Sequence, residues 1–148
     1  MNIIVKKIFD KEQLEQSFAI RLKVFVEEQQ VPADAELDEY DSLQSAAVHF
    51  LALIDGKPAG TIRMTEYDCE TAKLQRLAVL EEFRTCHVGS ALVSVLEQEA
   101  KQAGYGAVLL DGQIQARKFY EKQGYAAVSE EIIYDCDIPH VRMKKNLV

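Results

Sequence analysis

One short segment places several anion-binding groups at the junction of a predicted strand and a predicted helix. Arg84 lies in the loop after the strand, the helix begins around His87 or Val88, and Gly89 falls in its first turn. The first N–H groups of a helix lack intrahelical partners and stand at the positive end of its dipole, so they attract anions. The segment therefore predicts a pyrophosphate site. The alternative is that Arg84 is a solvated loop residue and Gly89 only allows close helix packing.

The cysteines indicate no covalent or metal chemistry. Cys69, Cys86 and Cys136 are odd in number, widely spaced and form no CxxC pair. This pattern favours reduced thiols over a disulfide framework or a zinc site. Cys86 stands in the predicted anion loop, but we do not assign it as a nucleophile.

The elements before this segment are predicted from periodicity and turn residues. Residues 3–5 open a strand, Asp10 is a plausible N-cap, and a helix with one buried stripe follows. The stripe consists of Leu14, Phe18, Leu22 and Phe25. Residues 29–45 are acidic and aperiodic, which predicts a long surface loop of a kind that is often functional. Residues 46–54, 59–67 and 72–80 are predicted strands, the first two joined by an Asp55-Gly56 turn.

The elements after the segment complete an alternating pattern. The helix that begins near Val88 ends near Gly104, and residues 107–110 form an apolar strand covered on both faces. A helix over residues 115–123 stops at Gly124, and residues 125–133 and 140–145 form a closing pair of strands. The order is β-α-loop-β-β-β-α-β-α-β-β. It predicts a mixed α/β sheet and excludes a helical bundle, a sandwich and a simple Rossmann alternation.

Composition limits the protein's size and partners. With 148 residues, 48% of them hydrophobic, the chain is long enough for one domain, residues 1–148, with its own core. Its 24 acidic and 17 basic side chains give a net charge of -7, which argues against nucleic acid as a partner. No apolar run has the length of a membrane helix, and no signal sequence is apparent, so we expect a cytoplasmic protein without a membrane partner.

Two motifs resemble those of the GNAT superfamily of acyl-CoA-dependent N-acetyltransferases. The segment Arg84-Thr85-Cys86-His87-Val88-Gly89 is similar to the cofactor loop Arg/Gln-x-x-Gly-x-Gly/Ala, with His87 at the first glycine. With helical dihedrals, His87 can keep its N–H aimed at the anion, while its ring adds a donor or lies on the surface. The segment from Gln113 to Tyr125 resembles Asn-x-x-Ala-x-x-Phe/Leu-Tyr-x-x-x-Gly-Phe/Tyr. The resemblance implies a mixed, mostly antiparallel sheet flanked by helices.

Further residues look like the ElaA-like branch of this superfamily. They are Val24-Phe25-Val26-Glu27-Glu28-Gln29, Glu36-x-Asp38-x-x-Asp41, Arg63, Arg76 and Ile138-Pro139-His140-Val141-Arg142-Met143. The resemblance covers nearly the whole chain. Its members use acetyl-CoA as acyl donor, without a metal, and superfamily members are often homodimers.

The resemblance also implies roles for individual residues. Main-chain groups of Leu77, Ala78 and Val79 pair with the pantetheine arm, and one N–H polarises the thioester carbonyl. The diphosphate lies on the amides of Thr85, Cys86, His87, Val88, Gly89 and Ser90, with Arg84 close by. Tyr120 protonates or hydrogen-bonds the sulfur, with Phe119 as its buried neighbour. Gln113 either bonds the cofactor or caps the next helix.

The base and the acceptor site stay open at this stage. Glu28, His140 or a chain of water molecules could take the proton of the amine. Arg63 and Arg76 fall on neighbouring strands and could anchor an acceptor carboxylate, although cross-strand pairing with Glu66 or Glu70 is a plainer explanation. The acidic loop either favours a cationic amine or is only a solvated surface.

We therefore expect an acetyl-CoA-dependent N-acetyltransferase that transfers acetyl directly to a primary amine of a small molecule or peptide in a ternary complex. One alternative is a non-catalytic CoA-binding or interaction module with the same fold. Another is an unrelated α/β domain that binds a different phosphate ligand. Binding of acetyl-CoA and release of free thiol with amines would distinguish the three.

Overall fold

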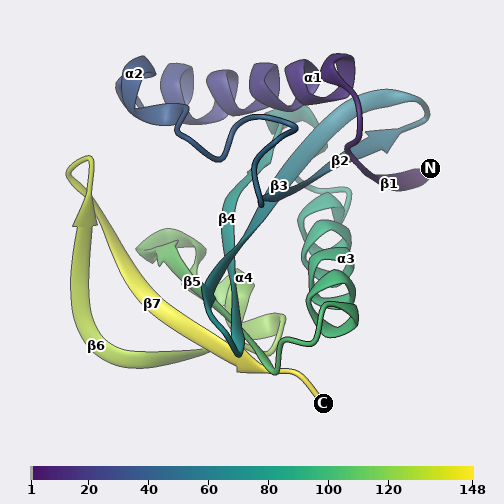
Figure 1. Cartoon of the computed structure of the whole chain (residues 1–148). Coiled ribbons are helices and arrows are strands. Elements are labelled where there is room, and N and C mark those ends of the chain that lie inside the picture. Colours follow the sequence, from purple (N-terminus) through teal and green to yellow (C-terminus); the bar gives the residue numbers. More distant parts are fainter. Residues whose placement is uncertain (1) are drawn as a thin grey trace.

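The computed structural model describes residues 2–148 and contains a seven-stranded sheet (Figure 1). The strands lie in the order β1-β2-β3-β4-β5-β7-β6, and neighbours are antiparallel except β4 and β5. Their bounds are β1 (Ile3–Lys7), β2 (Val48–Ile54), β3 (Lys57–Asp68), β4 (Thr71–Val79), β5 (Ala107–Gln113), β6 (Ala126–Asp135) and β7 (Ile138–Asn146). The predicted mixed, mostly antiparallel sheet is confirmed.

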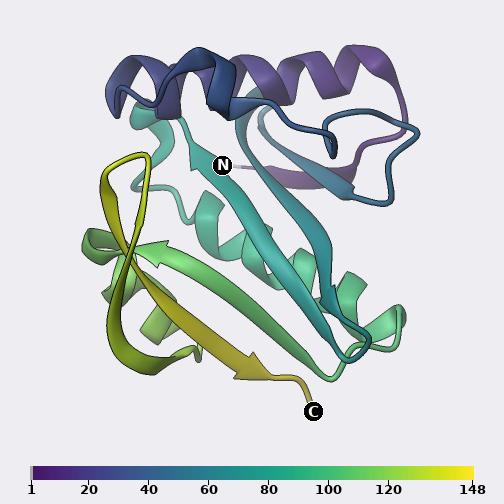
Figure 2. The same cartoon turned by 60° about the vertical axis from the view of Figure 1, so that its left-hand side comes forward.

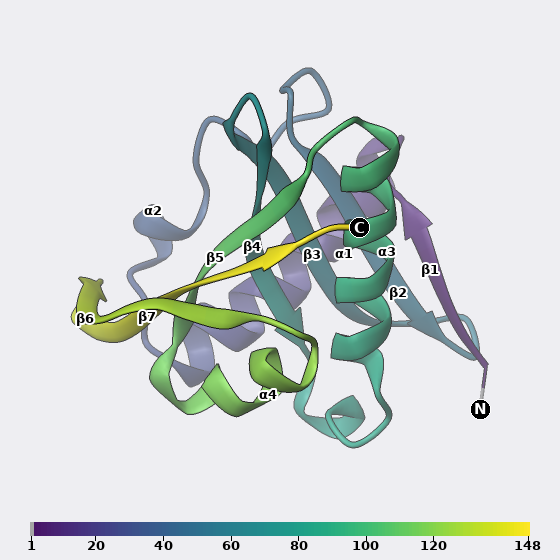
Figure 3. The ribbon, with the colours of Figure 1, turned by 90° about the horizontal axis from the view of Figure 1, so that it is seen from below.

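Helices cover both faces of this sheet (Figures 1 and 3). One face carries α1 (Lys11–Arg21), the π-helix η1 (Leu22–Glu28) and the single turn α2 (Ala33–Glu36). The other carries α3 (Val88–Gln102) and α4 (Arg117–Lys122), each preceded by a 3₁₀ turn, η2 (Glu81–Phe83) and η3 (Ile114–Ala116). None of the helices in residues 2–148 has the length and apolar character needed to span a bilayer.

The two faces of the sheet have separate hydrophobic cores because successive strand residues point in opposite directions. On β2, Phe50 and Ala52 join the core beneath α3, whereas Leu51 joins the core beneath α1. Gly60 on β3 brings α3 close to the sheet, since a Cβ there would lie 2.9 Å from Val88 Cγ1. The start of α3 is therefore fixed against the middle of the sheet.

The first helix differs from its prediction in phase. Asp10 caps α1 as expected, accepting a hydrogen bond of 2.8 Å from the N–H of Gln13. Beyond Arg21 the chain continues as a π-helix, which has more residues per turn than an α-helix. The predicted stripe is consequently wrong at Leu22, which is 46% exposed, while Val24 is buried.

The sheet divides between β4 and β5 (Figure 2). These parallel strands pair only where Thr71–Lys73 meets Ala107–Leu109, and then diverge. The later part of β4 therefore has no partner strand on its β5 side within residues 2–148. Those of its backbone N–H and C=O groups that do not pair with β3 face the opening, where they can form other hydrogen bonds.

A β-bulge interrupts β4 within the part that does not pair with β5. Arg63 pairs with Gln75 and Thr61 with Ala78, so Ile62 of β3 faces two residues, Arg76 and Leu77. Arg76 has a positive φ of 56°. A bulge of this kind redirects side chains, and it turns Arg76 toward the face covered by α1 and α2, where it contacts Glu36.

Candidate active site

A cavity of about 790 Å³ occupies the opening between β4 and β5. Its walls come from both faces of the sheet. Gly89, Phe119 and Tyr120 line it on the side of α3 and α4, and Glu36 and Arg76 line it on the side of α1 and α2. The cavity therefore passes through the division in the sheet.

The start of α3 forms one end of this cavity. His87 is its N-cap but has φ 64° and ψ 23°, and it makes no side-chain capping bond. The expectation of helical dihedrals at His87 is wrong, because its backbone is left-handed, a conformation that glycine adopts without steric cost. The first N–H groups of α3 still lack intrahelical acceptors, and His87, Gly89 and Ser90 line the cavity.

Two glycines, Gly89 and Gly112, allow the rings of Phe119 and Tyr120 of α4 to pack closely beside the cavity. A Cβ on Gly89 would lie 3.1 Å from Phe119 Cζ, and one on Gly112 would lie 3.1 Å from two Tyr120 ring carbons. Both glycines are thus required for the close approach of these rings. The two rings contact each other edge to face, with centroids 5.1 Å apart.

The Tyr120 side chain combines burial with a free hydroxyl. The residue is 7% exposed and lines the cavity. Within the part of the chain that the structure describes, its hydroxyl has no hydrogen-bond partner, whereas the Tyr125 hydroxyl donates to Glu97 Oε2 at 2.9 Å. Burial raises the pKa of Tyr120 far above its usual value, so this phenol stays protonated and can donate a hydrogen bond into the cavity.

Arg84 and Glu28 form an ion pair at the edge of the cavity. Arg84 Nη2 donates to Glu28 Oε2 at 2.6 Å, and Arg84 Nε donates to the Val79 carbonyl at 3.0 Å. Arg84 lines the cavity, but Glu28 does not. The structure therefore places Glu28 as the partner of Arg84, away from the cavity surface.

The side chain of Gln113, at the end of β5, forms a hydrogen bond with Gln29, the residue that follows η1. Its Nε2 donates to Gln29 Oε1 at 2.7 Å, and its Oε1 accepts from Gln115. Its side chain makes no capping bond to η3, so the helix-cap alternative is not observed. Gln113 and Gln29 both line the cavity.

His140 on β7 has one ring nitrogen bonded to the backbone and one without a partner among residues 2–148. Its Nδ1 lies 2.7 Å from the carbonyl oxygen of Ile138. A carbonyl only accepts hydrogen bonds, so Nδ1 donates to it, and Nε2 is the nitrogen at which this ring can gain or lose a proton. His140 lines the cavity, and Nε2 has no protein partner among residues 2–148.

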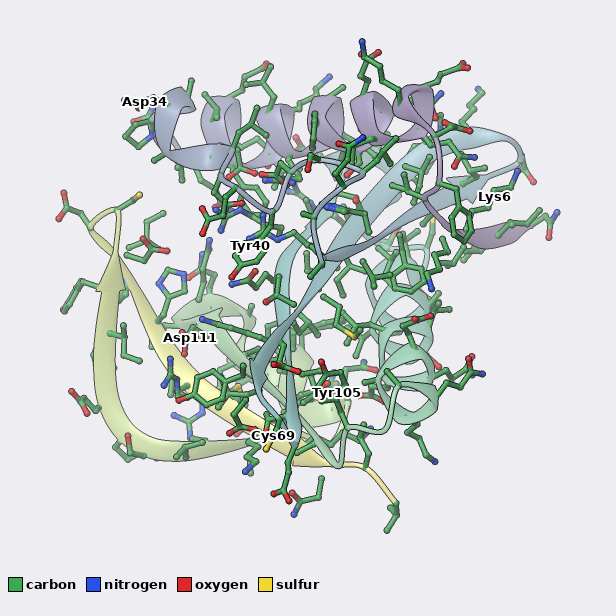
Figure 4. All side chains as sticks on the ribbon, viewed as in Figure 1. Lys6, Asp34, Tyr40, Cys69, Tyr105 and Asp111 are labelled. Atoms are coloured by element: carbon green, nitrogen blue, oxygen red, sulfur yellow. The ribbon has the colours of Figure 1, made fainter. Side chains whose placement is uncertain are left out.

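The acidic loop is held by buried ion pairs. Arg21 Nε donates to Glu36 at 2.6 Å and Arg21 Nη1 to Asp41 at 2.7 Å, while Arg63 Nη1 donates to Asp38 at 2.8 Å. Figure 4 shows Tyr40 of this loop beneath α1, and Arg63 Cζ lies 5.3 Å from its ring centroid. The prediction of a solvated surface loop is wrong for Glu36 and for the Asp41 side chain, which are buried.

Some predicted site residues lie away from the cavity surface. The Cys86 side chain packs partly against the core beneath α3, and Val88 is buried within that core. Arg63 is 1% exposed and binds Asp38, Asp41 and Gln75, so neither the cavity nor the predicted pairing with Glu66 or Glu70 involves it. The other predicted residues that line the cavity are Leu77, Ala78, Val79, Thr85 and Arg76.

Several polar cavity residues, among them Gln29, Glu36 and Asp135, were missed as site residues. Gln29 and Glu36 were predicted as parts of a loop, and both line the cavity. The close grouping of three acidic residues, Glu36, Asp38 and Asp41, was the available signal for a structured loop. Their partners Arg21 and Arg63 lie far away in the sequence, so their burial could not be predicted from local pattern.

A mixed sheet divided between two parallel strands, with a helix start and a tyrosine at the division, defines the GNAT class of acetyltransferases. Residues 7–147 match the family described as Acetyltransferase (GNAT) domain. The chain belongs to this family.

Known relatives extend over nearly the whole chain. The Bacillus subtilis (strain 168) protein BSU40680 is 43% identical over 141 residues, which cover 95% of each chain. Escherichia coli ElaA has a TM-score of 0.83 at 26% identity, covering 97% of this chain and 99% of that chain, in agreement with the branch that the motifs indicate. An aminoglycoside 6′-N-acetyltransferase solved with coenzyme A has the same fold, with a TM-score of 0.80 at 18% identity over 98% of this chain and 97% of that chain.

Proposed function

We propose that this protein transfers an acetyl group from acetyl-CoA directly to a primary amine of a small molecule or peptide. The observation that carries the proposal is one cavity that joins an unpaired strand edge, a free helix start and an unbonded tyrosine hydroxyl. These three features match the three parts of the donor: its pantetheine arm, its diphosphate and its thioester sulfur.

The pantetheine arm would pair with the free edge of β4. Leu77, Ala78 and Val79 line the cavity beyond the last residue that pairs with β5. An amide-containing arm can bond such an edge as an added strand does. A backbone N–H beside the thioester would then stabilise the oxyanion that forms on its carbonyl.

The diphosphate would bind at the start of α3. The unpartnered N–H groups of the first turn and the helix dipole favour an anion there. Arg84 stands beside the same end, although Glu28 holds it in the absence of ligand. The solved coenzyme A complex of the aminoglycoside 6′-N-acetyltransferase supports coenzyme A as the ligand of this fold, and we extend that ligand to this chain.

Two residues would carry out the proton transfers, one as acceptor and one as donor. The lone pair of His140 Nε2 takes a proton as the amine nitrogen attacks the thioester carbon, either directly or through water. The new C–N bond forms, the tetrahedral intermediate collapses with loss of the C–S bond, and Tyr120 donates a hydrogen bond or its proton to the departing sulfur. No acyl-enzyme is required, so Cys86 has no role in this scheme.

Ligand binding and turnover test the proposal separately. Acetyl-CoA should raise the melting temperature, because a ligand at about 100 times its Kd stabilises the folded state by roughly 2.7 kcal/mol. Free thiol should then appear with members of an amine panel. A melting shift without thiol release would instead support the CoA-binding module, which the left-handed His87 in the diphosphate loop keeps as the second candidate.

A further inference from the structure

The charges of the acidic loop are already balanced within the protein. Three carboxylates, those of Glu36, Asp38 and Asp41, face three guanidinium groups, those of Arg21, Arg63 and Arg76. Arg21 and Arg63 make all the ion pairs in this set that are 3.1 Å or shorter. The loop consequently offers little free negative charge to attract a cationic acceptor.

Arg76 is the weakly held member of this network. Its Nε lies 3.6 Å from Glu36 Oε2, and its Nη2 makes two long hydrogen bonds, of 3.3 Å to the Glu36 carbonyl and 3.5 Å to Asp38 Oδ2. Its Nε is buried without a partner. Its Nη1 also has no partner among the described residues. Unlike Nε, Nη1 is accessible to solvent.

Arg76 lines the candidate cavity. Arg76 directly precedes the β4 segment that we propose pairs with the donor, and the bulge turns its side chain to the face opposite Tyr120. His140 lines the same cavity. A group bound by Arg76 would therefore lie on the acceptor side of the thioester.

The other charges on this side favour a single negative charge on the ligand. Asp111 is engaged by Arg142 at 2.8 and 3.1 Å and by Lys73 at 3.8 Å. Glu36 and Asp38 stand close behind Arg76, so they would repel a dianion such as phosphate more strongly than a monoanion. Nη1, the accessible nitrogen of Arg76, carries two N–H donors that can form charge-assisted hydrogen bonds to a carboxylate.

We infer that Arg76 binds a carboxylate of the acceptor, so that the preferred acceptors are small molecules with both a primary amine and a carboxylate. This inference rests on the proposed function and specifies its substrate class. Asp135, which also lines the cavity, is the exposed acidic group available to the ammonium form of such an acceptor before it loses its proton.

Matched acceptors test this inference. We would measure thiol release with leucine, leucinamide and isoamylamine, and with equivalent triplets of other side-chain classes. The wild-type protein should prefer the carboxylate member of an accepted triplet by tenfold or more in kcat/KM. Arg76→Gln should lower kcat/KM for that member by about 10 to 100-fold, as expected for a charged hydrogen bond, and change the other two by less than about twofold.

Control variants separate this role from folding and general charge. Arg76→Lys keeps the charge and should recover part of the preference. Arg117→Gln removes an equally cationic side chain that pairs with Glu121 and Glu130 outside the cavity, and it should leave the preference unchanged. As a readout without turnover, amino acids added to the CoA complex should raise its melting temperature, whereas their amides should not.

The possible failures are distinguishable. Equal rates for all three members of each triplet, or an equal loss on all three in Arg76→Gln, would overturn the carboxylate assignment and leave the acetyltransferase proposal intact. Absence of thiol release with every amine, together with no melting shift from any amino acid, would overturn both.

Discussion

His87 occupies a backbone conformation that its side chain disfavours. Left-handed geometry costs an L-residue roughly 1–2 kcal/mol, and the φ of 64° at the start of α3 requires it. We expect His87→Gly to raise the free energy of unfolding by up to about 1 kcal/mol, reduced by the greater entropy of glycine in the unfolded chain. Urea denaturation measures this change.

A glycine in right-handed helix provides the control for that variant. Ala91 follows in α3, and Ala91→Gly should lower the free energy of unfolding by about 1 kcal/mol. If both glycines destabilise the protein equally, the left-handed strain at His87 is not significant.

Tyr120 and Tyr125 allow a matched test of the proton donor. Their rings lie 6.1 Å apart, but only Tyr120 lines the cavity. Tyr120→Phe should lower kcat by about 10²-fold with little change in the Kd of acetyl-CoA, because the lost interaction acts mainly in the transition state. Tyr125→Phe removes the bond to Glu97 and should leave kcat close to wild type. Unchanged turnover in Tyr120→Phe would remove Tyr120 from the donor role.

Individual residues were predictable where their role is local. The Asp10 cap and the positions of Gly89 and Tyr120 follow from motifs a few residues long. The left-handed backbone of His87 and the burial of Arg63 do not, because they depend on a turn geometry and on partners from distant segments. A family motif indicates which residues belong to a site, whereas their partners are fixed only by the folded chain.

At the scale of elements, the ion pairs tie the acidic loop to α1 and β3. Burial alone would raise the pKa of Asp41, but hydrogen bonds from Arg21 and from the Asp38 N–H, with the charges of Arg21 and Arg63, lower it well below its usual value. A carboxyl with a lowered folded-state pKa stabilises the fold fully above its unfolded value of about 3.9, and this stabilisation is lost as pH falls toward the folded value.

Asp41→Asn should therefore destabilise the protein in a pH-dependent way. Removing one partner of a buried ion pair costs about 3–5 kcal/mol, so a loss of this order is expected near neutral pH. The difference from wild type should shrink below about pH 4, where Asp41 begins to protonate in the unfolded wild-type chain. Denaturation curves across this range measure it, and a difference that does not depend on pH would contradict the ionic role.

Most elements agree with prediction, and the exceptions have tertiary causes. The element order and the Asp55-Gly56 turn follow from periodicity and turn chemistry. The π-helix η1 was not predicted, because the apolar residues after Arg21 also fit an α-helical spacing. Its different period exposes Leu22 and buries Val24. Val24 packs with residues of the sheet in the core beneath α1.

At the scale of the whole molecule, the sheet consists of two halves joined by a short ladder. Strands β1 to β4 form one half and β5 to β7 the other, with direct pairing over three residues of each strand. The sequence predicted strands on both sides of this division, but the divergence itself was not predictable from it.

Hydrogen exchange should detect a ligand in this division. Coenzyme A should slow exchange at the amides of the Leu77–Val79 segment that face the opening and at the first amides of α3, because these groups lack strand or helix partners in the free protein. Phe50 and Leu51 lie in a continuous ladder between β1 and β3 and provide an internal reference. Equal slowing at both places would indicate general stabilisation instead of direct contact.

The passage of the cavity through the sheet has a kinetic consequence. The nucleotide and the amine would approach from opposite faces, so neither blocks the entrance of the other and neither product must wait for the other to leave. Double-reciprocal plots with both substrates varied should then give intersecting lines, and each product should compete only with the substrate that uses the same entrance.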